Sequence, residues 1–113
     1  MPARLVSPDG RASIAIDRLL ILVGRDPRCD AWLDSLRLSA RHCCLVRDGD
    51  GLVVRDLGST NGTRINDRQV EHGRLRPGDS LAIANIRFRL ENDRADERPN
   101  RASQMSTARR TPD

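Results

Sequence analysis

Turn signals recur roughly every 8–12 residues along most of this chain. Pro-Asp-Gly at 8–10, Asp-Gly-Asp-Gly at 48–51 and Pro-Gly at 77–78 are combinations that reverse the backbone between strands. The runs between them are short, and no window carries apolar residues at helical spacing over three turns. The sequence therefore predicts an all-β protein of ten or so short strands, folded as a β-sandwich or barrel.

Individual runs indicate where the strands lie. Residues 4–16 and 42–55 should each form a hairpin around a central turn, and residues 65–70 should form a tight turn between two very short strands. Residues 19–23, Leu-Leu-Ile-Leu-Val, have the continuous apolar character of a buried strand. Residues 86–90 alternate strictly between apolar side chains and arginine.

The chain is long enough for one small domain with a modest core. From residue 92 onward it loses apolar residues and gathers Arg, Asp, Ser, Thr and Pro. We therefore expect one domain over residues 1–91 and a polar, disordered C-terminal tail over residues 92–113.

Charge and hydropathy argue against two classes of partner. The formal net charge is +4 and all 20 basic residues are arginines, but these arginines mostly alternate with acids, and the only aromatic residues are Trp32 and Phe88. Nucleic-acid binding usually needs a basic stripe with stacking aromatics, so it is only a third alternative. The longest apolar run has five residues, too few to span a bilayer, and no signal-type segment begins the chain. We expect a cytoplasmic protein without membrane or specific nucleic-acid partners.

No catalytic or metal-binding pattern is present in the sequence. Cys29, Cys43 and Cys44 lack CxxC spacing, and adjacent cysteines on a strand point to opposite faces, so we expect no metal and no cofactor. His42 precedes the cysteine pair, but no acid is placed to orient it, which favours a structural role. Without a nucleophile elbow or a P-loop, we predict that the protein is not an enzyme. For Trp32, packing inside the sandwich is favoured over a peptide platform.

Three polar segments fall where strands end or begin. Gly24-Arg25 ends one strand, Ser39 with Arg41 and His42 precedes another, and the run 58–63, Gly-Ser-Thr-Asn-Gly-Thr, must turn tightly. Loops of a sandwich gather at its ends, where guanidinium, hydroxyl and carboxamide groups together would bind an anion. The residues alone leave open whether these loops share one end.

The sequence resembles a forkhead-associated (FHA) domain, a phosphothreonine-peptide recognition module, over roughly residues 4–91. The resemblance rests on Gly24-Arg25, on Ser39-x-x-His42, and on the 59–63 run Ser-Thr-Asn-Gly-Thr with Asn66 after it. It implies a β-sandwich of about eleven short, mainly antiparallel strands in two sheets, with the peptide lying across loops at one end.

The resemblance also implies roles for individual residues. Arg25 and Ser39 should contact the phosphate, Thr60 should face the phosphothreonine, and Asn61 should hydrogen-bond the peptide backbone. Five residues should shape the site without touching phosphate, and His42 among them should pack beneath the loops and brace them. These site-shaping residues are Gly24, His42, Gly58, Ser59 and Gly62.

One position departs from the family pattern. Many members carry Arg or Asn where this chain has Ala40, and alanine provides no extra contact. Arg41 could compensate, or it could be a solvated residue at the strand edge. We predict a module that binds phosphothreonine-containing proteins marked by a Ser/Thr kinase. The alternative is a phosphorylation-independent interaction scaffold with the same fold.

Overall fold

The computed structural model describes residues 3–92, and these form eleven strands in two sheets. Six strands pair in one sheet, in the order β2 (Ser13–Ile16), β1 (Ala3–Val6), β11 (Ile86–Asn92), β10 (Ser80–Ile83), β7 (Thr63–Ile65) and β8 (Arg68–Gln69). Five pair in the other, in the order β4 (Ala31–Trp32), β3 (Leu20–Gly24), β5 (Cys43–Asp48), β6 (Gly51–Asp56) and β9 (His72–Leu75). The prediction of a β-sandwich is confirmed.

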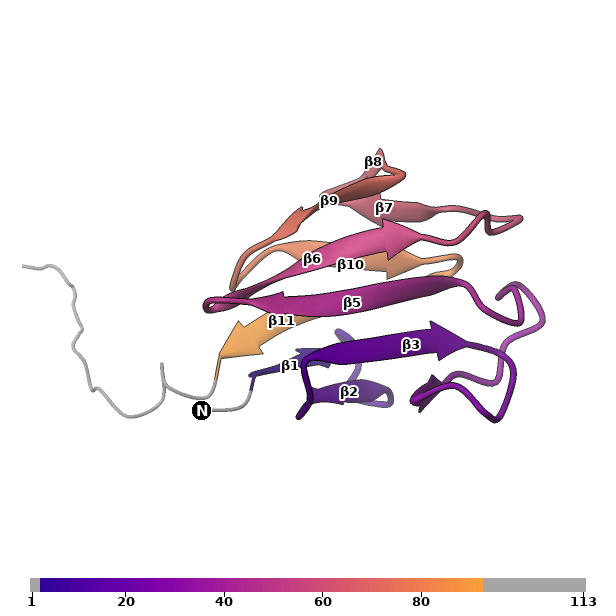
Figure 1. Ribbon diagram of the computed structural model, residues 1–113, viewed down its shortest axis with the longest axis horizontal. Coiled ribbons are helices and arrows are strands. Elements are labelled where there is room, and N and C mark those ends of the chain that lie inside the picture. The colour runs from indigo at the N-terminus through magenta and orange to yellow at the C-terminus, as the bar shows by residue number, and fades with distance from the viewer. Residues whose placement is uncertain (1–2, 93–113) are drawn as a thin grey trace, which may run out of the picture.

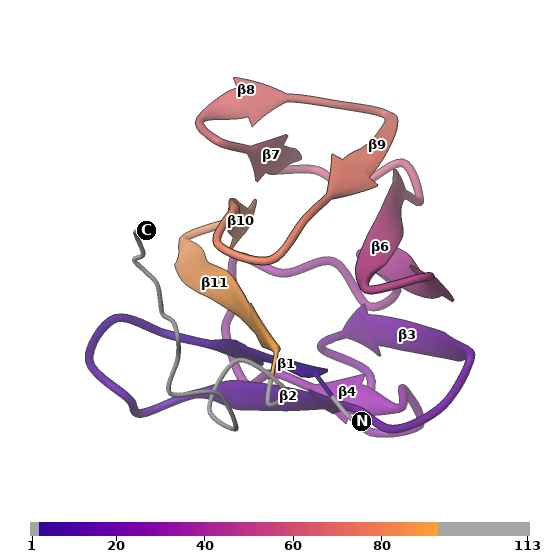
Figure 2. The same cartoon turned by 90° about the vertical axis from the view of Figure 1, so that its left-hand side faces the viewer.

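The two sheets form two layers with the core between them (Figures 1 and 2). Every pairing is antiparallel except that of β3 with β4, which is parallel. Tight turns explain the antiparallel neighbours. Between β7 and β8, for example, Asn66 and Asp67 both have positive φ (49° and 69°), as a two-residue hairpin turn of the primed type requires.

Alternation along the strands builds the core. On β11, Phe88 and Leu90 are each 1% exposed, whereas the arginines between and beside them face solvent, as the pattern of 86–90 predicts. On β5, Cys43 is fully buried and its neighbour Cys44 is only partly so, which confirms that the two thiols lie on opposite faces. Burial raises the pKa of the Cys43 thiol, so it stays protonated.

Two expectations about apolar residues are wrong. The run 19–23 is not a wholly buried strand, because Leu19 and Leu20 are 65% and 52% exposed. Trp32 does not pack inside the sandwich but is 53% exposed. Its neighbour Ala31 packs against the core, and alternation along β4 then directs the indole outward.

Some elements differ from the sequence expectation or lie beyond the described chain. Strand β9 has no strand-like pattern, since its four residues are His, Gly, Arg and Leu, and it forms because β6 offers it an edge. Strand β11 runs to Asn92, and the rest of the expected tail, residues 93–113, lies outside the described residues. Over residues 3–92 no helix is long and apolar enough to cross a membrane.

Candidate functional site

The three polar segments meet at one end of the sandwich, which we call the loop end. In the five-stranded sheet β3 and β6 run toward it and β5 starts from it, because β5 is antiparallel to both of these neighbours. Strand β7 of the other sheet follows the loop after β6 and also starts from this end. Residues 24–26, 37–42 and 57–62 therefore emerge together, on the right in Figure 1. The question that the sequence left open is settled: these loops share an end.

One wall of the loop end is made by backbone pairing. The N–H of Arg25 donates to the carbonyl of Ser39, and the N–H of Asp26 donates to that of Ala40, both at 3.1 Å. Gly24 makes this approach possible, because a Cβ there would lie 2.0 Å from the Ala40 carbonyl oxygen. The glycine thus sets the distance between Arg25, whose side chain is exposed, and Ser39.

The other wall is organised by Asp56, the last residue of β6. One carboxylate oxygen accepts the backbone N–H groups of Gly58 and Ser59, both at 3.0 Å. The other oxygen accepts the hydroxyls of Ser59 and Thr63. Ser59 in turn accepts the N–H of Gly62 at 3.0 Å. A single carboxylate therefore holds the 57–63 loop in shape.

These contacts keep the Asp56 carboxylate ionised. Burial is the largest single influence and would raise its pKa, but it is outweighed by the hydroxyls of Ser59 and Thr63, the Ser59 N–H and the nearby His42. The net result is a pKa below the ordinary value for aspartate. The loop is consequently held by charge-assisted hydrogen bonds, which are stronger than neutral ones.

Two hydrogen bonds tie the walls together. The backbone N–H of Thr60 donates to the Ser39 hydroxyl at 3.0 Å, and the Asn61 amide donates to the Arg37 carbonyl at 2.7 Å. Since Ser39 Oγ accepts from the protein, its own hydrogen can be donated to a ligand. The Asn61 carboxamide oxygen likewise keeps its capacity to accept an N–H from an extended chain.

His42 lies beneath both walls and is fully buried. Its Nδ1 accepts the N–H of Ser39 at 3.2 Å, and its Nε2 lies 2.9 Å from the Gly62 carbonyl. The tautomer with hydrogen on Nε2 meets both partners. The ring therefore joins two loops that are about twenty residues apart in the chain, as the expected bracing role requires.

The surface of the loop end is cationic. Arg25, Arg37 and Arg41 are exposed, and no ion pair joins any of them to an acid within residues 3–92. The nearby Asp26 is already paired with Arg28 at 2.8 Å. The side-chain and backbone hydrogen bonds from Arg28, with a smaller effect of Arg41, lower the pKa of Asp26 to about 2. This carboxylate thus leaves the charge of the three arginines available.

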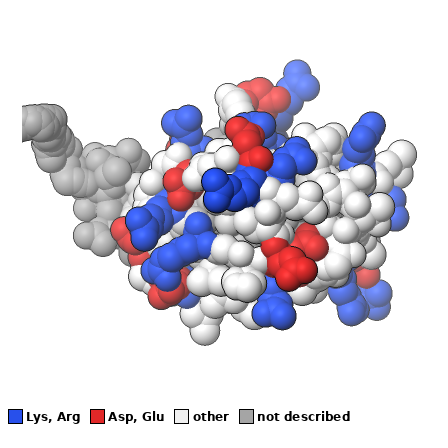
Figure 3. Space-filling model, turned by 90° about the horizontal axis from the view of Figure 1, so that it is seen from above, with Lys and Arg blue, Asp and Glu red and all other residues white. Residues whose placement is uncertain are grey.

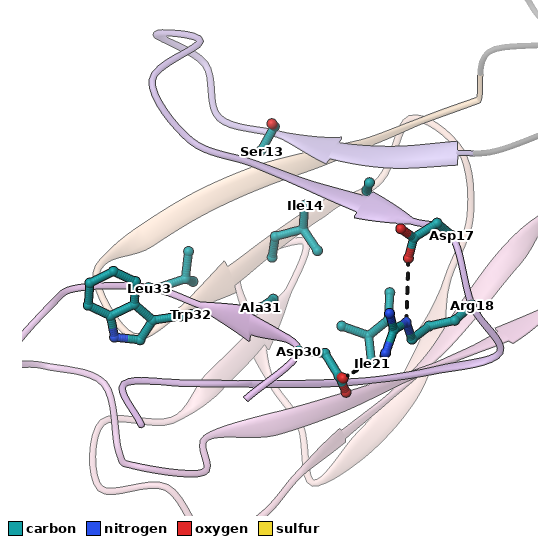
Figure 4. A pocket seen from close by; sticks show the side chains of 10 residues that line it. Ser13, Ile14, Asp17, Arg18, Ile21, Asp30, Ala31, Trp32 and Leu33 are labelled. Atoms are coloured by element: carbon teal, nitrogen blue, oxygen red, sulfur yellow. Dashed lines mark hydrogen bonds and ion pairs between the residues drawn. The ribbon is translucent and has the colours of Figure 1, made fainter. Parts of the chain in front are cut away.

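The loop end is an open surface. One hollow, of about 280 Å³, opens between β2 and β4, where Arg18 bridges Asp17 and Asp30, and neither Arg25, Ser39 nor Thr60 lines it (Figure 4). An open surface with separated hydrogen-bonding groups suits an extended chain better than an enclosed small molecule. Away from the loops, arginines and acids are interspersed, as Figure 3 shows for one face.

Comparison with known proteins agrees with this geometry. The sequence model of the FHA domain matches residues 21–84, which is more than half of the chain. The chain belongs to the FHA domain family. Its fold is accordingly that of a non-catalytic binding module.

Two curated relatives are regulatory proteins that contain an FHA domain. The chain is 34% identical over 81 residues to the oxoglutarate dehydrogenase inhibitor of Corynebacterium jeikeium, covering 72% of this chain and 56% of the relative. It is 32% identical over 81 residues to the glycogen accumulation regulator GarA of Mycolicibacterium smegmatis, covering 72% and 51%. The chain therefore spans about half the length of the curated relatives it matches.

A solved structure supports the same assignment. An FHA domain from a structural and functional study of phosphothreonine-dependent FHA domain interactions superposes with a TM-score of 0.73. The two are 25% identical, and the match covers 81% of this chain and 97% of the other.

The FHA fold brings all ten residues singled out from the sequence to the loop end, while their ligand roles remain predictions. Two further residues of the loop end escaped sequence reasoning. Asp56 could have been found from its place directly before Gly-Ser, where a carboxylate caps a turn. Arg37 looked like any loop arginine, and only its carbonyl contact with Asn61 places it here. The ten residues are Gly24, Arg25, Ser39, Arg41, His42, Gly58, Ser59, Thr60, Asn61 and Gly62.

Proposed function

We propose that the loop end binds phosphothreonine-containing segments of a partner protein, so that a Ser/Thr kinase writes the mark and this domain reads it. The observation that carries the proposal is the group of three exposed arginines without acid partners beside the Ser39 and Thr60 hydroxyls. A phosphate carries about −1.5 to −2 charge at pH 7 and offers three acceptor oxygens. The arginines and hydroxyls supply matching donors.

Each residue has a distinct part in this proposal. Arg25 gives the principal charge contact, and Ser39 donates its free hydroxyl hydrogen to a phosphate oxygen. Thr60 borders the phosphothreonine, and Asn61 uses its carboxamide oxygen for the peptide backbone while its amide stays on Arg37. Arg41 assists from the Ala40 side, where alanine offers no donor. Resemblance to the family favours threonine over serine through a small niche for the methyl group.

The test is calorimetry with a peptide selected from a degenerate phosphothreonine library. Hydrogen bonds to charged groups contribute about 1.5–3 kcal/mol each, so the phosphorylated peptide should bind and its unphosphorylated form should not. Arg25→Ala and Ser39→Ala should each weaken binding by about tenfold or more. Arg47→Ala is the matched control, because Arg47 is exposed at the opposite end of β5. Equal affinity for both forms of the peptide would refute the proposal.

Ala40 favours a second candidate, a scaffold that keeps the fold but recognises an unphosphorylated surface. Its carbonyl is occupied by Asp26 and by the Cys29 thiol, and its side chain adds no donor to the site. Under this alternative the natural complex survives phosphatase treatment and Arg25→Ala leaves it intact.

A further inference from the structure

The outer face of the five-stranded sheet is apolar at its centre. On β3, β5 and β6 the inward side chains are 3% exposed or less: Ile21, Val23, Leu45, Leu52 and Val54. Because side chains alternate across a strand, the residues between them point to solvent. These outward residues are Leu20, which is 52% exposed, and Leu22, Cys44, Val46 and Val53, which are partly buried.

Register places these outward residues side by side. Leu20 pairs with Val46, and Val46 pairs with Val53, so three apolar side chains cross three strands in one row. Leu22 pairs with Cys44 in the next row. Trp32 on β4 pairs with Gly24, two positions after Leu22, and its exposed ring borders both this group and the hollow between β2 and β4. We call these six residues the apolar face; Figure 1 looks onto the sheet that carries it, with β3, β5 and β6 in front.

The other sheet obeys the usual rule. Most of its outward positions on β1, β7 and β11 carry charges (Arg4, Arg64, Arg87, Arg89 and Glu91), with Val6 the apolar exception. A solvated sheet face is normally polar, whereas a contiguous apolar group that faces outward and is at least partly exposed marks an interaction site. The apolar face therefore differs from the outer face of the other sheet, and this difference indicates that it contacts another molecule.

The apolar face adjoins the loop end. The indole N–H of Trp32 donates to the carbonyl of Arg25 at 2.8 Å, which holds the ring beside the proposed phosphate contact. Trp32 also pairs in register with Gly24. A molecule held at Arg25 can therefore reach the apolar face without leaving the protein surface.

The apolar face is small for an independent interface. A stable complex needs about 20–30 residues from each partner, and this face has six. A small contact is effective when the same partner is already bound nearby, because tethering raises its effective concentration. We propose that the apolar face is the second contact for the partner whose phosphothreonine binds at the loop end, an inference that rests on the proposed function.

Charged residues at the β9 edge of the apolar face indicate which side chains the partner should carry there. The row of Leu22 and Cys44 continues across the sheet to Arg55 and then to His72. Arg55 is exposed and has no acid partner among the residues described. The segment that fits is apolar, with an acidic residue on its β9 side.

The experiment compares a short and an extended probe in calorimetry. The short probe is the library-selected phosphothreonine peptide. The extended probes add, at either end, a ten-residue Gly-Ser linker and the segment Asp-Leu-Ile-Leu-Asp; such a linker spans about 17 Å on average. The wild-type chain should bind at least one extended probe about tenfold more tightly than the short one.

A triple variant, Leu20→Thr, Val46→Thr and Val53→Thr, should lose this gain while it binds the short probe normally, which also verifies its fold. The matched control, Arg4→Thr with Arg89→Thr on the other sheet, should keep the gain. A gain that persists in the triple variant, or no gain with either extended probe, overturns the inference while the short probe still binds. If the short probe itself fails to bind the wild type, the proposed function falls. Wild-type dimerisation abolished by the triple variant would instead assign the face to a second copy.

Discussion

The two ends of the sandwich are built differently. At the loop end, hydrogen bonds join residues about twenty positions apart, such as Thr60 with Ser39 and His42 with Gly62. At the opposite end, the β9–β10 turn has a local bond from the Arg76 N–H to Asp79 and is joined to β11 by two backbone bonds with Leu90. Both ends therefore depend on distant residues, but only the loop end joins them through side chains of the predicted site, Ser39 and His42. Changes at the loop end should therefore affect stability and binding together, and changes at the opposite end should affect stability alone.

The largest expected loss of stability comes from adding a Cβ atom where two backbone segments lie very close together. Gly24→Ala forces a Cβ against the Ala40 carbonyl, and Gly51→Ala, at the opposite end, places one 2.5 Å from the Leu75 carbonyl oxygen. Each should lower the free energy of unfolding by about 3 kcal/mol in urea denaturation, because the backbone must shift. Only Gly24→Ala should weaken phosphopeptide binding in protein that is still folded. Equal loss of affinity in both variants would contradict the claim that only the loop end affects binding.

A smaller effect should follow from neutralising a carboxylate. Asp56→Asn removes charge-assisted bonds from two hydroxyls and two N–H groups, and should cost about 2 kcal/mol of stability. Asp48→Asn breaks only an exposed pair with Arg74, and should cost less than about 1 kcal/mol. Thermal denaturation and peptide titration of both variants measure the difference. A loop end that binds peptide normally with Asp56→Asn contradicts the organising role of this residue.

The pH dependence of stability gives a further test of the role of Asp56. The pKa of Asp56 is lower in the folded protein than the ordinary 3.8, so its stabilising contribution is complete above that value and is lost as the pH falls through the folded pKa. The stability gap between wild type and Asp56→Asn should therefore be constant near neutral pH and should shrink below about pH 4. Urea denaturation at several pH values measures it. If the stability difference between the two proteins widened on acidification, the pKa of Asp56 would be raised in the folded protein and not lowered.

Local chemistry explains how much of the fold could be predicted. Turn residues act within four positions and alternation within two, so the hairpins of 4–16 and 42–55 and the strand at 86–90 were predictable. Strand β9 was not, because its own residues do not favour a strand and its stability comes from pairing with β6. Predicting the site took a family pattern, because the residues of each short motif are compatible with an ordinary turn.

The sequence by itself determined the all-β class and the turns, and only resemblance to a family grouped the ten residues of the loop end. Tertiary structure alone decided that Asp56 organises a wall, that Trp32 faces outward beside Arg25, and that Leu20, Val46 and Val53 form one outward-facing row. The physical reason is the distance along the chain over which the determining contacts act. A strand that is apolar on both sides, such as Leu52-Val53-Val54, reads the same whichever face is covered. Only the position of the other sheet determines which side chains are buried.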